Sequence, residues 1–123
     1  MSHFTHMKTE FRNLSYLRKA LNRLNIVHKL NYVELPNANL VISQENGYDV
    51  KFIWNGQEYE LVADLSFWEQ PYPIQSFIDK VAQQYAGEVI IGESQKKGFQ
   101  PVKYQKNDDS SNTLVLERWQ YNN

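Results

Sequence analysis

The sequence predicts an α+β domain in which two main helices pack on one face of a mostly antiparallel sheet. Three observations predict this class. One segment alternates apolar and polar residues through an Asn-Gly turn, and two others place apolar residues at helical spacing. The length of 123 residues fits a single domain over residues 1–123. Helices on one face of such a sheet bury both apolar stripes in one core.

The N-terminal part predicts a strand followed by a helix. Residues 2–11 contain aromatic and β-branched side chains without Gly or Pro, which is typical of a strand. Asn13 is a candidate N-cap, because its amide oxygen can accept a hydrogen bond from the first helical turn. The helix itself is predicted over residues 14–24 by leucines at three-four-three spacing: Leu14, Leu17, Leu21 and Leu24.

The clearest local signal is a β-hairpin within residues 48–63. Every second residue on both sides of Asn55-Gly56 belongs to an apolar set: Tyr48, Val50, Phe52, Trp54, Tyr59, Leu61 and Ala63. Asn-Gly accepts positive φ at both positions, as a type I′ turn requires. We therefore predict two strands joined by a two-residue loop. Residues 40–42 predict a short strand before this hairpin, and residues 26–35 alternate loosely as a strand would.

A second helix is predicted from residue 74, where apolar residues recur at helical spacing to Tyr85. Gly87 could end it. We favour continuation, with a break, to Lys96-Lys97-Gly98, since lysines and glycine suit a helix C-terminus. A strand over residues 88–91 is the competing interpretation. Residues 99–105 and 113–119 then predict a closing pair of strands around a polar loop.

Composition removes several classes of function. The net charge is −1 without a basic block, so we expect no nucleic-acid binding. The chain contains no cysteine, which excludes disulfides, thiolate metal sites and cysteine nucleophiles. No apolar run reaches the length of a membrane span and no signal peptide is evident, so we expect no membrane insertion.

Histidines and carboxylates offer one possible site. His3 and His6 are three residues apart, which on a strand sends them to opposite faces and works against shared metal ligation. Glu58, Glu60 and Asp64 fall on one face of the second hairpin strand, where a solvated row is the ordinary interpretation. The alternative is a small metal- or ligand-binding enzyme that uses these histidines and acids.

No catalytic constellation is recognisable. There is no nucleophile elbow, no G-x-G-x-x-G and no phosphate-binding loop, and the chain has three histidines in all. We therefore expect no catalytic residues, no cofactor and no resident metal. The leading prediction is a non-catalytic accessory protein that binds another protein.

Two aromatic segments are the candidate partner-binding surface. Trp68 and Glu69 lie in a proline-bearing connection, and Arg118 and Trp119 lie near the chain end. Trp and Arg are favoured anchors of protein interfaces. The alternative is that Trp68 and Trp119 pack on each other over a helix end. Neither interpretation fixes the oligomeric state.

Short motifs spread over nearly the whole chain resemble one known family. They are Met1–Phe4, Lys8-Thr9, the 14–24 helix, Gly47–Val50, Trp54–Gly56, Tyr59–Leu65, Phe67–Pro71, Tyr85-Ala86, Lys97–Phe99 and Leu116–Trp119. Together they resemble the hypothetical chloroplast reading frame thirty-five family of algal plastids and cyanobacteria. The resemblance implies a setting, the plastid stroma or the cyanobacterial cytoplasm, and no activity. Gly87 and Gly92 depart from the family pattern, which leaves the continuity of the second helix open.

Overall fold

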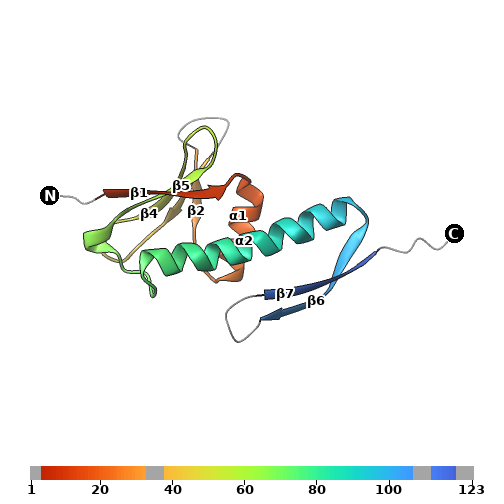
Figure 1. Ribbon diagram of the computed structural model, residues 1–123. Coiled ribbons are helices and arrows are strands. Elements are labelled where there is room, and N and C mark those ends of the chain that lie inside the picture. The colour runs from red at the N-terminus through yellow and green to blue at the C-terminus, as the bar shows by residue number, and fades with distance from the viewer. Residues whose placement is uncertain (1–3, 33–37, 107–111, 119–123) are drawn as a thin grey trace.

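A computed structural model describes residues 4–32, 38–106 and 112–118, and from residue 99 onward it describes the backbone. The fold is α+β, as predicted (Figure 1). In chain order the elements are β1 (Phe4–Phe11), α1 (Leu14–Arg23), β2 (Lys29–Asn31), β3 (Asn39–Ile42), β4 (Val50–Trp54), β5 (Tyr59–Asp64), the 3-10 helix η1 (Leu65–Phe67), α2 (Ile74–Lys96), β6 (Phe99–Lys106) and β7 (Asn112–Arg118).

The main sheet has five strands in the order β1-β5-β4-β3-β2, and every neighbouring pair is antiparallel. β6 and β7 form at the predicted positions. Among the described strands they pair only with each other, as a separate two-stranded sheet. In Figure 1 both helices lie on one side of the main sheet, and α2 runs past its edge. The β6–β7 hairpin folds back along the second half of α2.

α1 begins and ends where the sequence supplies capping groups. The Asn13 Oδ1 atom accepts a hydrogen bond from the Tyr16 N–H at 3.0 Å, which confirms the predicted N-cap. At the other end Asn25 adopts a φ of 57°, and the Ile26 N–H bonds back to the Leu21 carbonyl at 2.9 Å. This is a Schellman ending with asparagine at the left-handed position, and it turns the chain sharply after the helix.

The predicted hairpin forms, but its loop is not the predicted type I′ turn. Trp54 pairs with Tyr59, so four residues, 55–58, form the loop. The Asn55 side-chain oxygen accepts from the backbone N–H groups of Gln57 and Glu58, each at 2.9 Å. An asparagine side chain that organises its own turn in this way competes with the two-residue loop.

One apolar core fills the space between the sheet and the helices. Its largest fully buried side chains come from α1, from β3 to β5 and from the first half of α2: Leu17, Leu21, Leu40, Val50, Phe52, Tyr59, Leu61, Phe77 and Val81. The alternation along β4 and β5 sends these strands' core residues to the helix-covered face. Trp54, a member of the alternating apolar set, packs against this cluster and is partly buried.

α2 is continuous from Ile74 to Lys96, so the favoured extension through Gly87 and Gly92 is confirmed. The break expected within it does not occur, and the competing strand over residues 88–91 is wrong. Gly98 follows with a φ of 84°, the left-handed conformation that ends a helix. The helix survives its glycines because packing against α1 stabilises it, and packing outweighs intrinsic propensity.

Close contacts join the two helices. The Tyr85 hydroxyl accepts hydrogen bonds from the backbone N–H groups of Arg12 at 3.1 Å and Asn13 at 3.0 Å, just before α1. Glu88 is buried and pairs with the Arg23 side chain. A Cβ on Gly92 would lie 2.7 Å from Cζ of Tyr16, so α1 lies against α2 at a distance that only glycine permits.

Replacing Gly92 by alanine tests this contact. The intrinsic gain in helix propensity is about 1 kcal/mol, yet we expect a net loss of stability because the buried Tyr16 ring must move, and overpacking typically costs ~1–3 kcal/mol. Urea unfolding measures the change. Gln83→Ala, on the exposed surface of α2, is the matched control and should change stability by less than about 0.5 kcal/mol. A stabilised Gly92→Ala protein would contradict the close contact.

The buried Tyr59 hydroxyl predicts a pH dependence. It donates to the Ala38 carbonyl at 3.2 Å, and burial raises its pKa above the ordinary value. The neutral phenol is therefore favoured by folding. Its contribution is complete below about pH 10, the unfolded pKa, and is lost as pH rises through the folded pKa.

Tyr59→Phe should accordingly destabilise the protein by about 1 kcal/mol at neutral pH, because one buried hydrogen bond is lost. The difference in unfolding free energy between the two proteins should shrink above about pH 10. The reason is that only the wild type has the Tyr59 phenol, whose raised pKa makes its stability fall as pH rises. Unfolding curves at several alkaline pH values measure it. A difference that stays constant with pH would refute this role for the hydroxyl.

Candidate functional site

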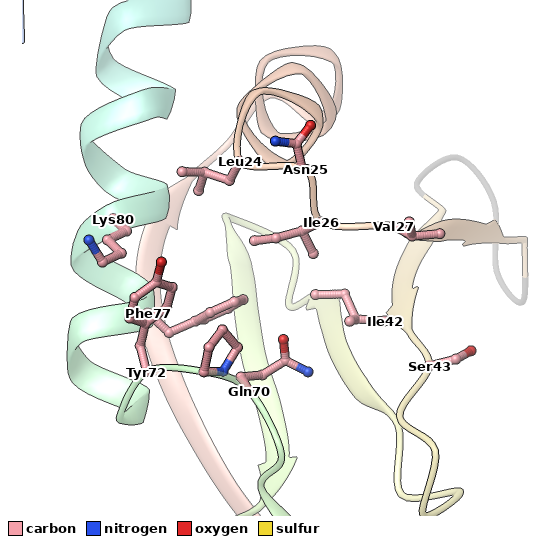
Figure 2. Close-up of a pocket in the computed structure, with 11 residues that line it drawn as sticks. Leu24, Asn25, Ile26, Val27, Ile42, Ser43, Gln70, Tyr72, Phe77 and Lys80 are labelled. Atoms are coloured by element: carbon pink, nitrogen blue, oxygen red, sulfur yellow. The ribbon is translucent and has the colours of Figure 1, made fainter. Parts of the chain in front are cut away.

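A cleft opens where three segments that are distant in sequence meet. Its volume is about 290 Å³, and its walls come from the end of α1, the end of β3, and the connection leading into α2. Figure 2 shows Ile26 and Ile42 facing Phe77, Tyr72 and Gln70 across it. The full lining is Leu24, Asn25, Ile26, Val27, Ile42, Ser43, Gln70, Pro71, Tyr72, Phe77 and Lys80.

The ending of α1 builds one wall. The left-handed turn at Asn25 directs Ile26 toward the core, where it is partly buried. Val27 follows at the rim with 88% of its surface exposed, although valine is a residue that proteins usually bury. Val27 therefore adds an exposed apolar side chain to the rim of the cleft.

Gln44 fixes the opposite wall. Its Nε2 group donates to the backbone carbonyls of Tyr48 at 2.6 Å and Phe67 at 2.9 Å. Its Oε1 atom accepts from the Glu69 N–H at 2.9 Å and from the Gln70 side chain at 3.0 Å. One side chain thus ties the β3–β4 turn to the connection that enters α2. The connection between η1 and α2 is thus stabilised by side-chain hydrogen bonds and has no regular secondary structure of its own.

Aromatic contacts complete this wall. The Trp68 indole N–H donates to the Tyr72 carbonyl at 2.7 Å, and the indole meets the Phe77 ring edge-on at 5.3 Å. The Lys80 ammonium lies 4.6 Å from the centre of the Tyr72 ring, a cation–π contact. Trp68 and Lys80 therefore hold Phe77 and Tyr72 in position at the cleft wall.

The lining of the cleft is mostly apolar. Among the described residues that line it there is no carboxylate and no histidine, and its titratable side chains are Tyr72 and Lys80. An apolar cleft with a few polar groups at its edge suits an apolar side chain or a small ligand.

The structure places the predicted histidine–acid site on the other face of the sheet. His6 Nδ1 lies 3.4 Å from Glu60 Oε2, and their side chains are 61% and 23% exposed. His3 lies outside the described residues, and Glu58 belongs to the hairpin loop. Within the described part of the chain, no three His, Asp or Glu residues gather closely enough to hold a metal ion.

Glu60 is held in its ionised form. The Asn55 side chain donates to Oε1 at 3.1 Å and, as the largest cause, lowers the pKa of Glu60; His6 and Lys8 act in the same direction. His6 and Glu60 therefore form a hydrogen-bonded pair on the sheet surface. The lowered pKa makes the Glu60 carboxylate a weaker base.

Asp64 departs from the solvated row predicted for the acidic residues. It is 4% exposed, and its Oδ1 atom accepts from the Ser66 N–H at 3.0 Å, which caps η1. The alternation of the strand places it with Glu60, but the chain folds over it where the strand ends. A solvated interpretation of this residue is therefore wrong.

The candidate partner-binding residues are partly described. Trp68 is half-buried and supports the cleft wall, while Glu69 is exposed beside Gln70 at its edge. Arg118 is the last residue of β7, and Trp119 lies outside the described residues, as does any contact between Trp68 and Trp119. The cleft itself was missed from the sequence, because Gln44 and Val27 carry no local pattern that connects them with residues 70–80.

The fold is that of a small α+β protein with a mostly apolar cleft on the helix-covered side of its sheet. The chain belongs to the family described as "Protein of unknown function (DUF1257)", whose profile matches residues 14–115. In the residues that the structure describes, no helix is long and apolar enough to cross a bilayer.

Curated relatives match along nearly their full length. The chain is 60% identical to a protein of Trieres chinensis, over 94% of this chain and 97% of the relative. It is 41% identical to one of Guillardia theta, over 97% and 98%, and 38% identical to one of Cyanophora paradoxa, over 98% and 100%. All three are described as "Uncharacterized protein ycf35", a hypothetical chloroplast reading frame, which confirms the resemblance and makes these relatives plastid-encoded. No solved structure matches the chain.

Replacing Gln44 by alanine should loosen the connection into α2. The variant leaves the Glu69 N–H and the Phe67 carbonyl with one partner fewer each, and we expect a loss of about 1–3 kcal/mol in stability. Backbone ¹⁵N order parameters should fall at residues 67–70. Gln57→Ala, in the exposed hairpin loop, is the control. Unchanged order parameters in Gln44→Ala would show that Gln44 does not fix the wall.

Proposed function

We propose that the chain is a non-catalytic accessory protein of the plastid that binds another protein. The cleft is the centre of the proposed surface, with Trp68 and Glu69 at its edge. Arg118 and Trp119 are proposed as further partner-binding residues outside the cleft; Arg118 pairs with Phe99, which follows the far end of α2. The observation that carries the proposal is the preformed apolar cleft, lined without any carboxylate or histidine and bordered by the exposed Val27.

Pre-organisation supports a binding role. The Gln44 hydrogen bonds and the Trp68 contacts hold the connection in place before any partner arrives, so little ordering cost is incurred on binding. The exposed rim offers Val27 and Tyr72 for apolar contact and Lys80 and Glu69 for polar contact. Interfaces commonly combine an apolar centre with such a polar rim.

The sequence and the relatives together support the proposed setting and the proposed class of partner. Plastid-encoded relatives support the plastid stroma, or the cytoplasm of a cyanobacterium, as the place of action. A net charge of −1 favours a protein over a nucleic acid as partner. We treat residues 1–123 as one domain, since the main core unites α1, α2 and the five-stranded sheet.

The test compares partner capture by variants of the immobilised protein in a plastid extract. Val27→Glu places a charge at the apolar rim, and Glu69→Lys reverses the charge beside it. Because both side chains are exposed, we expect folding stability to change by less than about 0.5 kcal/mol and capture to fall by at least about tenfold.

Tyr32→Glu is the matched control, since Tyr32 is also an exposed large side chain and follows β2 at the far end of its ladder with β3. Its capture should equal that of the wild type. Trp119→Ala and Arg118→Ala test the chain-end contribution. Equal capture by Val27→Glu, Glu69→Lys and the wild type would remove the cleft from the proposed function.

A further inference from the structure

A second hollow lies on the sheet face opposite the helices. Its volume is about 270 Å³, and its lining includes Phe4, Tyr48, Asp49, Lys51 and Asp64. The pairing of Phe4 with Asp64 across β1 and β5 places an aromatic ring beside a buried carboxyl group. This hollow is separate from the cleft and does not depend on the proposed function.

One carboxylate oxygen of Asp64 lacks a hydrogen-bond donor. The residue is 4% exposed, and one oxygen, Oδ1, accepts from the Ser66 N–H. The other, Oδ2, is buried and has no hydrogen-bond partner among the described residues. A buried carboxylate oxygen without a donor is costly, and such groups in native proteins are nearly always satisfied by protein, water or a ligand.

The hollow supplies negative charge and aromatic surface together. Asp49 adds a second carboxyl group, and neither Asp49 nor Asp64 forms an ion pair with a described side chain. Phe4 is 60% exposed, and the Tyr48 ring is fixed by stacking on Phe67 at 3.8 Å. Lys51 stands in the same hollow as a competing cation.

We propose that this hollow binds a guanidinium group. A guanidinium is planar, weakly hydrated and rich in N–H donors, so it can donate to the Asp64 and Asp49 carboxylates while stacking on an aromatic ring. Exposed Phe4 and Tyr48 offer such rings. A bare divalent cation would instead require several oxygen ligands, and in this hollow it would meet apolar walls and the Lys51 ammonium.

The test uses agmatine and the peptide acetyl-Gly-Arg-Gly-amide as probes, followed by NMR titration of backbone amides. Both should shift residues around Phe4, Asp49 and Ser66 in a saturable way. A citrulline peptide, which has the same shape without the charge, should not. Tighter binding of the arginine peptide than of agmatine would assign the group to a protein partner, and the reverse would assign it to a small molecule.

Three variants at the hollow give results of opposite sign. Asp64→Asn keeps an oxygen to cap Ser66 but removes the charge, and it should weaken binding by about tenfold, as should Asp49→Asn. Lys51→Gln should strengthen binding because a competing cation is gone. Asp79→Asn, on the exposed surface of α2, is the control and should leave binding unchanged.

Two outcomes would overturn the assignment. One is a failure of specificity: the citrulline peptide binds as strongly as the arginine peptide, or the NMR shifts caused by the arginine peptide are the same in Asp64→Asn, Asp49→Asn and the wild type. The other is saturable binding of Mg²⁺ or Ca²⁺ at the hollow that Asp64→Asn abolishes, in the absence of any guanidinium effect. If Asp64→Asn fails to fold, Asp49→Asn and Lys51→Gln still decide the matter through their opposite signs.

Discussion

The packing of α2 on the five-stranded sheet is the interaction on which the rest of the structure depends. Phe77 and Val81 enter a core whose other walls are Phe52 and Leu61 of the sheet and Leu17 of α1. Burial of such side chains contributes about 1.5–3 kcal/mol each, so this contact contributes several kcal/mol to stability. It also fixes where the connection into α2 must run, and that connection forms one wall of the cleft. The opposite sheet face is left open, and the second hollow lies there.

Periodicity predicted the elements that this packing uses. The leucine stripe of α1, the alternating hairpin strands and the apolar spacing of α2 all appear at or near their predicted positions, because each is set by which face enters the core. The predicted two-residue type I′ loop of the hairpin was wrong. Asn55 uses its side chain to organise a four-residue turn, and the Trp54–Tyr59 pairing then fixes the register. Turn chemistry of this kind depends on one side chain and leaves no periodic trace.

The cleft and the second hollow could not be predicted, because they arise from contacts between distant segments. The side chain of Gln44 accepts a hydrogen bond from the Glu69 N–H, 25 residues away. The sequence marks the segment that contains Glu69, but no pattern connects that segment with Gln44. Asp64 shares the alternation of the acidic row, yet its place at the strand end buries it and turns it into a cap for Ser66. The family resemblance found the right relatives and the motif that contains Asp64. It could not show that one carboxyl oxygen there would lack a donor.

Native-state hydrogen exchange tests the central role of the α2–sheet contact most directly. Backbone amides of Phe77 to Val81 in α2 should share one protection free energy with those of β4 and β5, equal to that of global unfolding, because neither part keeps its core without the other. Amides of residues 67–70 should exchange sooner, through local opening. Should α2 exchange well before the sheet strands, the sheet would be stable without the helix. The dependence of the core, the cleft and the second hollow on the α2–sheet contact would then be contradicted.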